Sequence, residues 1–166
     1  MKVLLDTSVL VAAMVEAHPD HKRALPWLQH AKKGTYQGLI SAHSLAELYA
    51  VLTRLPIQPK ISPSLANQLL QDNVLDTFEI VSLSKADYAE IIGYLSKNNI
   101  IGGVTYDALQ LHAAWKAQAD QIVTINHKDF RRIYPHLADK IVSPTFTDQF
   151  QQDTNTENGD SIESDD

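Results

Sequence analysis

Four acidic side chains lie far apart in the sequence, each beside an expected strand end or on an expected helix: Asp6, Glu47, Asp107 and Asp129. Carboxylates brought together from separate elements repel one another, so one or more should have a raised pKa unless a cation neutralises them. Mg²⁺ and Mn²⁺ prefer such oxygen ligands. A centre of this kind can activate water for attack on a phosphodiester. If the fold gathers the four acids, metal-dependent phosphodiester hydrolysis is the chemistry they favour.

Each acid also has an ordinary structural explanation. Asp6 could lie at a turn, and Asp107 lies in the first turn of a helix, where the dipole favours a negative charge. Glu47 could be an exposed residue paired with Arg54, and Asp129 could complete a capping box at the start of a short helix. No single acid therefore identifies a site.

Apolar runs and helical patterns alternate along the chain, which predicts an α/β fold with a parallel sheet covered by helices. The expected strands span 2–6, 37–41, 78–82, 121–125 and a short segment near 139–143. The expected helices span 8–16, 20–33, 43–54, 63–76, 85–97, 105–119 and 127–133. In an open sheet of this type, Asp6 should face the crevice at the carboxyl ends of the strands, and Thr7 and Ser8 offer hydroxyls to cap the next helix.

The helix that carries Glu47 has a clear apolar stripe. Its i, i+3, i+4, i+7 pattern predicts that four residues face the core: Leu45, Leu48, Tyr49 and Leu52. Glu47 lies off that stripe, and its helical neighbours Ala50 and Val51 form a face too apolar for an ordinary solvated glutamate. The helix that begins near Thr105 is rich in alanine, which predicts a slim inner helix that approaches its neighbours closely.

The segment Gln121–Phe130 reads as a short buried strand that ends in polar residues. Thr124, Asn126 and Asp129 all follow its apolar part. They fit a capped turn, with Asn126 as N-cap, and they also fit a contribution to a site at the strand end. Both interpretations can hold together.

At this point the chain resembles the PIN-domain ribonucleases, and especially the VapC-like toxins of bacterial toxin–antitoxin pairs. The resemblance covers about residues 1–143 and rests on four short motifs in a fixed order: Leu4-Leu5-Asp6-Thr7-Ser8-Val9-Leu10, Ala46-Glu47-Leu48, Tyr106-Asp107-Ala108 and Val123-Thr124-Ile125-Asn126-His127-Lys128-Asp129-Phe130. It implies a three-layer α/β/α sandwich with a mainly parallel central sheet. It also implies a metal-dependent endoribonuclease with RNA as substrate, a small antitoxin protein as partner, and a homodimer.

By this resemblance, Asp6, Glu47 and Asp107 match three acids of the family site. Many relatives have Asp where this chain has Asn126, which leaves Asp129 as the nearest carboxylate for the fourth position. Asp6 and Asp107 are the expected direct ligands of Mg²⁺ or Mn²⁺, while Glu47 and Asp129 bind a second metal or orient water. The residues expected to support these ligands are Thr7, Ser8, Thr124 and Asn126.

RNA binding needs positive charge beside the acids, and Lys128, Arg131 and Arg132 cluster just after the fourth motif. A second basic group, on the segment 20–33, is expected to be an ordinary solvated face. His18 and His21 could suggest zinc, but the chain has no Cys and Pro19 separates them, so we expect surface residues. His112 is expected on a helix face rather than among metal ligands.

Composition limits the remaining choices. The chain of 166 residues is long enough for one domain with a real core, and the lack of Cys excludes disulfides and thiolate catalysis. Residues 151–166 hold six of the 20 acids and no Lys or Arg, which leaves 14 acids against 14 bases in the rest. We therefore expect a PIN-like domain at 1–146 and an acidic, disordered tail at 147–166. No signal peptide or membrane span is visible, which predicts a soluble cytoplasmic protein.

Two other functions compete with the nuclease. One is a catalytically weak PIN-fold module that binds RNA or protein, and the fourth site position would discriminate it. The other is a phosphatase or phosphoacceptor domain with Asp6 as nucleophile. The dehalogenase-like type needs a second Asp two residues on, where this chain has Ser8, and a receiver domain needs further acids before Asp6. The phosphoacceptor hypothesis therefore ranks last.

Overall fold

The first strand, β1 (Lys2–Leu5), lies at the centre of a parallel sheet because its apolar residues are buried on both faces. Val3, Leu4 and Leu5 are each 0% exposed in the computed structural model, which describes residues 1–145. The sheet has five strands in the order β3-β2-β1-β4-β5, and each strand pair in the described part is parallel. The expected domain boundary at 146 and the acidic tail at 147–166 lie outside the described residues.

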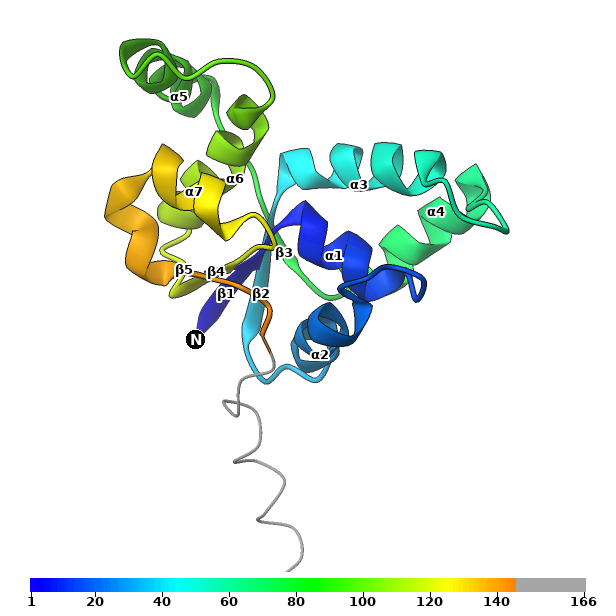
Figure 1. The fold of residues 1–166 in the computed structure, drawn as a ribbon. Coiled ribbons are helices and arrows are strands. Elements are labelled where there is room, and N and C mark those ends of the chain that lie inside the picture. The colour runs from blue at the N-terminus through cyan, green and yellow to red at the C-terminus, as the bar shows by residue number, and fades with distance from the viewer. Residues whose placement is uncertain (146–166) are drawn as a thin grey trace, which may run out of the picture.

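Strands and helices alternate as the sequence predicts (Figure 1). The strands are β1, β2 (Gln37–Ser41), β3 (Glu79–Val81), β4 (Gln121–Val123) and β5 (Ile141–Val142). The helices are α1 (Thr7–Met14), α2 (His21–Lys32), α3 (Ala42–Arg54), α4 (Pro63–Leu70), α5 (Lys85–Lys97), α6 (Val104–Lys116) and α7 (His127–Ile133). Among the described residues, none of these helices is both long and apolar enough to cross a membrane.

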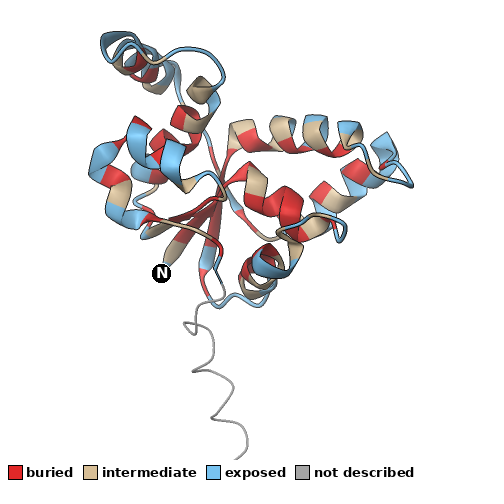
Figure 2. Ribbon diagram, viewed as in Figure 1, coloured by how far each residue is buried: buried red, intermediate tan, exposed pale blue. Residues whose placement is uncertain are grey.

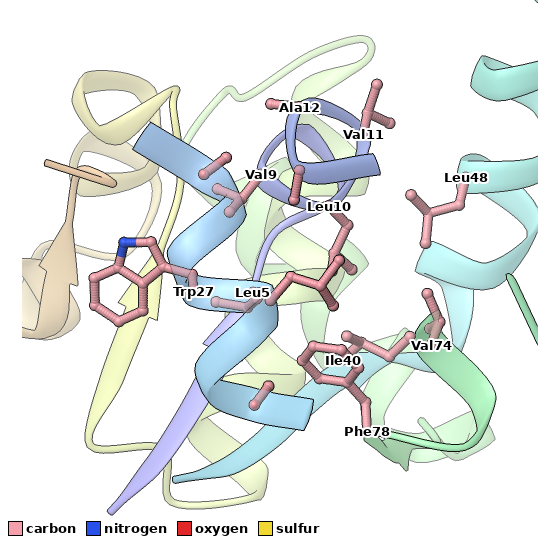
Figure 3. Packing of buried hydrophobic residues seen from close by; sticks show 14 of the residues in the cluster. Leu5, Val9, Leu10, Val11, Ala12, Trp27, Ile40, Leu48, Val74 and Phe78 are labelled. Atoms are coloured by element: carbon pink, nitrogen blue, oxygen red, sulfur yellow. The ribbon is translucent and has the colours of Figure 1, made fainter. Parts of the chain in front are cut away.

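Alternation along β1 divides the core into two layers. Val3 and Leu5 belong to one core cluster and Leu4 to the other. Helices α1 to α4 lie on one side of the sheet and α5 to α7 on the other (Figures 1 and 2). The first layer includes Trp27 of α2 and Leu48 of α3 (Figure 3). The result is a three-layer α/β/α sandwich in which β1 contributes to both cores.

The structure departs from the sequence expectations in three places. Helix α4 ends at Leu70 and continues as a π-helical turn, Gln71–Leu75, instead of one regular helix to residue 76. A 3₁₀-helix, Pro135–Lys140, precedes β5 and was not expected. Tyr49 was expected in the core but is 42% exposed, because α3 turns Ser44 and Leu48 toward the sheet instead.

Candidate active site

The crevice of this sheet opens between β1 and β4, where the strand order reverses. The backbone N–H of Asp6, the residue after β1, donates to the carbonyl of Val123 at the end of β4, over 3.0 Å. Crevices outside the carboxyl ends of strands at such a switch point are the usual ligand sites of open α/β sheets. The fold therefore places the residues after β1 and β4 at one edge, between α1 and α3 on one side and α6 and α7 on the other (Figure 1).

Asp6 lies at the bottom of this crevice and is 3% exposed. Its carboxylate accepts a hydrogen bond from the Thr124 hydroxyl, 2.8 Å away, and another from Ser8. The backbone N–H of Ile125 donates to the Ser8 hydroxyl, and that of Asn126 donates to the Thr124 hydroxyl. Burial raises the pKa of Asp6, while the hydrogen bonds from Ser8 and Thr124 act in the opposite direction.

These contacts change the expected role of the residues after β1. The N-cap position of α1 is Asp6 itself, and neither Thr7 nor Ser8 caps the helix. Their hydroxyls are instead directed to carboxylates, Ser8 to Asp6 and Thr7 to Glu47. The hydroxyl residues after β1 therefore hold acidic side chains in position through hydrogen bonds.

Glu47 reaches the same crevice from α3. One of its carboxylate oxygens accepts from the Thr7 hydroxyl at 2.8 Å and from the Gln110 side-chain amide at 3.3 Å. The Gln110 amide also contacts the Thr7 oxygen, at 3.3 Å. Glu47 is half-buried, and in the described structure it forms no ion pair with Arg54. The ordinary explanation of an exposed, paired glutamate is therefore wrong.

Asp107 enters from the first turn of α6 and has the most informative electrostatics. Its pKa is raised from 3.8 to about 7, first by burial and then by the negative charges of Asp6, Glu47 and Asp129. Like charges disfavour ionisation of a neighbouring acid, and Asp6, Glu47 and Asp129 all act on Asp107 in this way. The slim, alanine-rich α6 that carries Asp107 is an inner helix, as its sequence predicts.

Three of the acids line one cavity of about 440 Å³. Its lining residues are Asp6, Thr7, Ser8, Val11, His18, Asp20, Glu47, Val51, Leu55, Asp107, Ile125 and Asn126. Neither Lys nor Arg occurs among these described lining residues, so the carboxylates have no cationic side chain inside the cavity. This donor set fits a hard divalent cation such as Mg²⁺ or Mn²⁺. Within residues 1–145, no three acidic or histidine side chains already stand at metal-ligand spacing.

Asn126 and Asp129 were both candidates for the fourth position of the acidic site, and the structure places them differently. Asn126 lines the cavity, whereas the Asp129 side chain is 60% exposed and lies 3.8 Å from Arg132. Asp129 acts on Asp107 through its charge and does not line the cavity. The expected capping box is wrong, because the Asn126 side chain makes no capping hydrogen bond to α7 and Asp129 pairs with Arg132 instead.

The basic residues of α7 differ in their surroundings. Lys128 is exposed, and Arg132 is exposed beside Asp129. Arg131 donates to the backbone carbonyl of Ile141 over 2.8 Å, which ties its guanidinium to β5. Lys128 and Arg132 are therefore better placed than Arg131 to meet a phosphate.

Sequence reasoning missed three residues of this site. Gln110 is 1% exposed and connects Thr7 with Glu47. The available signal was a long polar side chain one turn after Asp107, between two leucines of the helix. His18 and Asp20 line the mouth of the cavity from the α1–α2 loop. His18 was expected at the surface but is half-buried and lines this cavity.

The other two histidines considered from the sequence are also more buried than expected. A ring nitrogen of His21 lies 2.9 Å from the carbonyl of Ala12. His112 is 3% exposed, with its ring 3.6 Å from the Asp87 carboxylate and packed against Trp115. Both have protein partners away from the acid cavity.

Comparisons with known proteins point to one family. The family model described as the PIN domain matches residues 3–135. Ribonuclease VapC40 of Mycobacterium tuberculosis is 33% identical over 128 residues, covering 77% of this chain and 87% of the relative. Ribonuclease VapC27 of the same organism is 31% identical over 116 residues, covering 70% and 79%.

A solved structure has a similar fold. The crystal structure of VapBC2 from Rickettsia felis, bound to a DNA fragment from its promoter, aligns with a TM-score of 0.61 and 26% identity. The alignment covers 86% of this chain and 98% of that chain. The PIN-domain match to residues 3–135 includes all four acids.

Proposed function

Because the chain belongs to the PIN-domain family, we propose that it is a metal-dependent endoribonuclease that hydrolyses RNA phosphodiester bonds, and that it is the toxin of a toxin–antitoxin pair. Two relatives above 30% identity are named ribonucleases, and the similar crystal structure is a VapBC complex. The observation that carries the proposal is the cavity lined by Asp6, Glu47 and Asp107, in which burial and then the negative charges of the other acids raise the pKa of Asp107 to about 7.

Asp6 and Asp107 would hold Mg²⁺ or Mn²⁺, with Glu47 as a further ligand or as the acceptor of a proton from the attacking water. When bound there, the metal would activate water and offset negative charge on the phosphate. Thr7 and Gln110 fix one oxygen of Glu47, and Ser8 and Thr124 fix Asp6. These contacts hold the acids in place against their mutual repulsion.

The remaining residues would contact the substrate or change the charge around the cavity. Asn126 offers an amide to the cavity, and Asp129 adds negative charge from outside it. Lys128 and Arg132 would contact the RNA backbone, which carries negative charge past an acidic cavity and therefore needs nearby cations.

The test is cleavage of defined single-stranded RNAs by the purified protein with Mg²⁺ or Mn²⁺, and with EDTA. We expect cleavage that EDTA abolishes and that Asp6→Asn and Asp107→Asn reduce at least about 100-fold, the scale of a lost charge-stabilising group. Asp129→Asn should reduce it less, and Lys128→Ala should weaken binding and flatten its salt dependence. RNA binding without metal-dependent cleavage would favour the alternative of a catalytically weak binding module.

We propose a small antitoxin protein as the partner because apolar surface adjoins the acids. A groove of about 350 Å³, lined in part by Glu47, Val51 and Leu55, shares these three residues with the acid cavity. A larger apolar cavity of about 660 Å³ lies between the end of α1, the loop before α4 and α4 itself. An amphipathic helix could bury its apolar face there, with an Arg directed to the acids.

Co-expression with the adjacent small open reading frame tests the partner. We expect a stable complex whose nuclease activity is suppressed. A fully active complex would contradict the toxin proposal but leave the nuclease proposal standing. The homodimer and the cytoplasmic location are further proposals. Light scattering of the purified chain and fractionation of cells that express it would test them.

A further inference from the structure

Two aromatic rings stack between the first turns of α3 and α6, the helices that carry Glu47 and Asp107. His43 lies in the first turn of α3 and Tyr106 in the first turn of α6, with ring centroids 5.0 Å apart and planes 7° from parallel. Tyr106 is 51% exposed although His43 covers one side of its ring. An aromatic side chain this exposed contributes little to the core, so packing does not account for the pair.

The pair stands one helical turn from the acids. His43 and Glu47 share a face of α3 because they are four residues apart, and Tyr106 and Gln110 share a face of α6 for the same reason. Gln110 donates to Glu47 over 3.3 Å. The two helices are therefore joined by two successive contacts, about 6 Å apart along the helix axes.

These two contacts define where the ring pair lies relative to the acid cavity. The inner contact, between Glu47 and Gln110, involves an acid that lines the cavity, and the outer contact, between His43 and Tyr106, includes the half-exposed Tyr106 ring. Asp107 follows Tyr106 in the chain, so the same turn of α6 supplies one acid and one exposed ring. Figure 1 shows the first turns of α3 and α6 side by side above the sheet.

We propose that the His43–Tyr106 pair is a stacking platform for a nucleobase of single-stranded RNA, next to the phosphodiester that enters the acid cavity. This inference rests on the proposed nuclease function. A cavity lined by carboxylates repels the RNA backbone, so affinity must come from contacts beside it. Aromatic rings stack on bases of every type, which suits a strand held by one flanking base.

Tyr106 is the residue that touches the base in this proposal, and His43 supports its ring from behind. Removing the Tyr106 ring should therefore weaken RNA binding without altering the acids. Tyr106→Phe keeps the stacking surface and should retain binding. Tyr88, another exposed tyrosine, lies in the first turn of α5 away from the acid cavity and provides a matched control.

The experiment uses the full chain carrying Asp6→Asn to prevent cleavage, and a short single-stranded RNA with 2-aminopurine at successive positions. We expect 2-aminopurine fluorescence to be quenched at one position, and Tyr106→Ala to abolish that quenching and weaken affinity about 5- to 100-fold. Tyr106→Phe and Tyr88→Ala should stay within about twofold. In the otherwise wild-type chain, Tyr106→Ala should raise KM for RNA and leave kcat nearly unchanged.

Each other outcome has a distinct meaning. Unchanged affinity and quenching in Tyr106→Ala, with metal-dependent cleavage by the wild type, would overturn the platform and leave the nuclease standing. A change in oligomeric state by light scattering, with RNA affinity retained, would make the pair a protein contact and also overturn it. A wild-type chain that neither binds nor cleaves RNA would overturn the platform together with the proposed function.

Discussion

Asp107→Asn should make the metal-free protein more stable above neutral pH, because it removes a carboxylate that the fold forces against other acids. The folded-state pKa of Asp107 is about 7, against 3.8 ordinarily. As pH rises from about 4 to about 7, the unfolded chain releases the proton before the folded chain does. The free energy of unfolding therefore falls through that window and stays low above it.

The size of the effect follows from the same pKa. The full difference would correspond to about 4 kcal/mol at 1.36 kcal/mol per pKa unit. Asp107 is only half-buried, so solvent screens the repulsion, and we expect about 1–2 kcal/mol at pH 8 and almost none at pH 4. For a domain of this length, that gain is equivalent to about 2–8 °C in Tm.

Urea denaturation in EDTA, followed by circular dichroism at pH 4, 6 and 8, measures this difference. Asp139→Asn provides the control, because Asp139 is an exposed acid outside the cavity and should show no pH-dependent gain. A parallel loss of stability in Asp107→Asn and the wild type between pH 4 and pH 8 would refute this prediction. In that case the Asp107 carboxyl would not be held among the other acids.

Three further predictions concern the same fold. Mg²⁺ or Mn²⁺ at about 100 times its Kd should raise the free energy of unfolding by about 2.7 kcal/mol in thermal melts, and Asp6→Asn should remove the gain; an unchanged wild-type midpoint would contradict it. Gly38→Ala should cost about 1–3 kcal/mol in urea denaturation, because its Cβ would lie 2.6 Å from the Phe78 ring, and an unaltered midpoint would disprove this. Thr124→Val should raise the pKa of Asp6 by removing a hydrogen bond to its carboxylate, as carboxyl NMR would show, and a constant pKa would count against it.

The sequence predicted the fold well because the local hydrophobic pattern of each element matches its burial in the folded structure. The run Val3–Leu5 has no polar residue, as a strand buried on both faces requires, and the alternating elements leave a parallel sheet as the simplest arrangement. The π-helical turn after α4 could not be predicted from the sequence, because the apolar pattern continues through it. Tyr49 fits the apolar stripe of α3, but the position of α3 on the sheet leaves it outside the core.

The site was only partly predictable for a similar reason. Strand ends are visible in a sequence, so Asp6 and Thr124 could be placed at a common edge, and their hydrogen bond is present. The partners of Glu47 depend on how α3 and α6 pack, which no local pattern encodes, and Gln110 was therefore missed. The geometry of the α1–α2 loop likewise decides that His18 lines the cavity.

The most direct test of the central claim is a crystal of the protein grown with Mn²⁺ and measured for its anomalous signal. The claim predicts a peak inside the cavity, bound by oxygens of Asp6 and Asp107 at about 2.0–2.2 Å, and absent from Asp6→Asn crystals grown in the same way. A saturated crystal with no peak between these carboxylates, or with Mn²⁺ bound only elsewhere, would contradict the claim that the acid cluster is a metal centre.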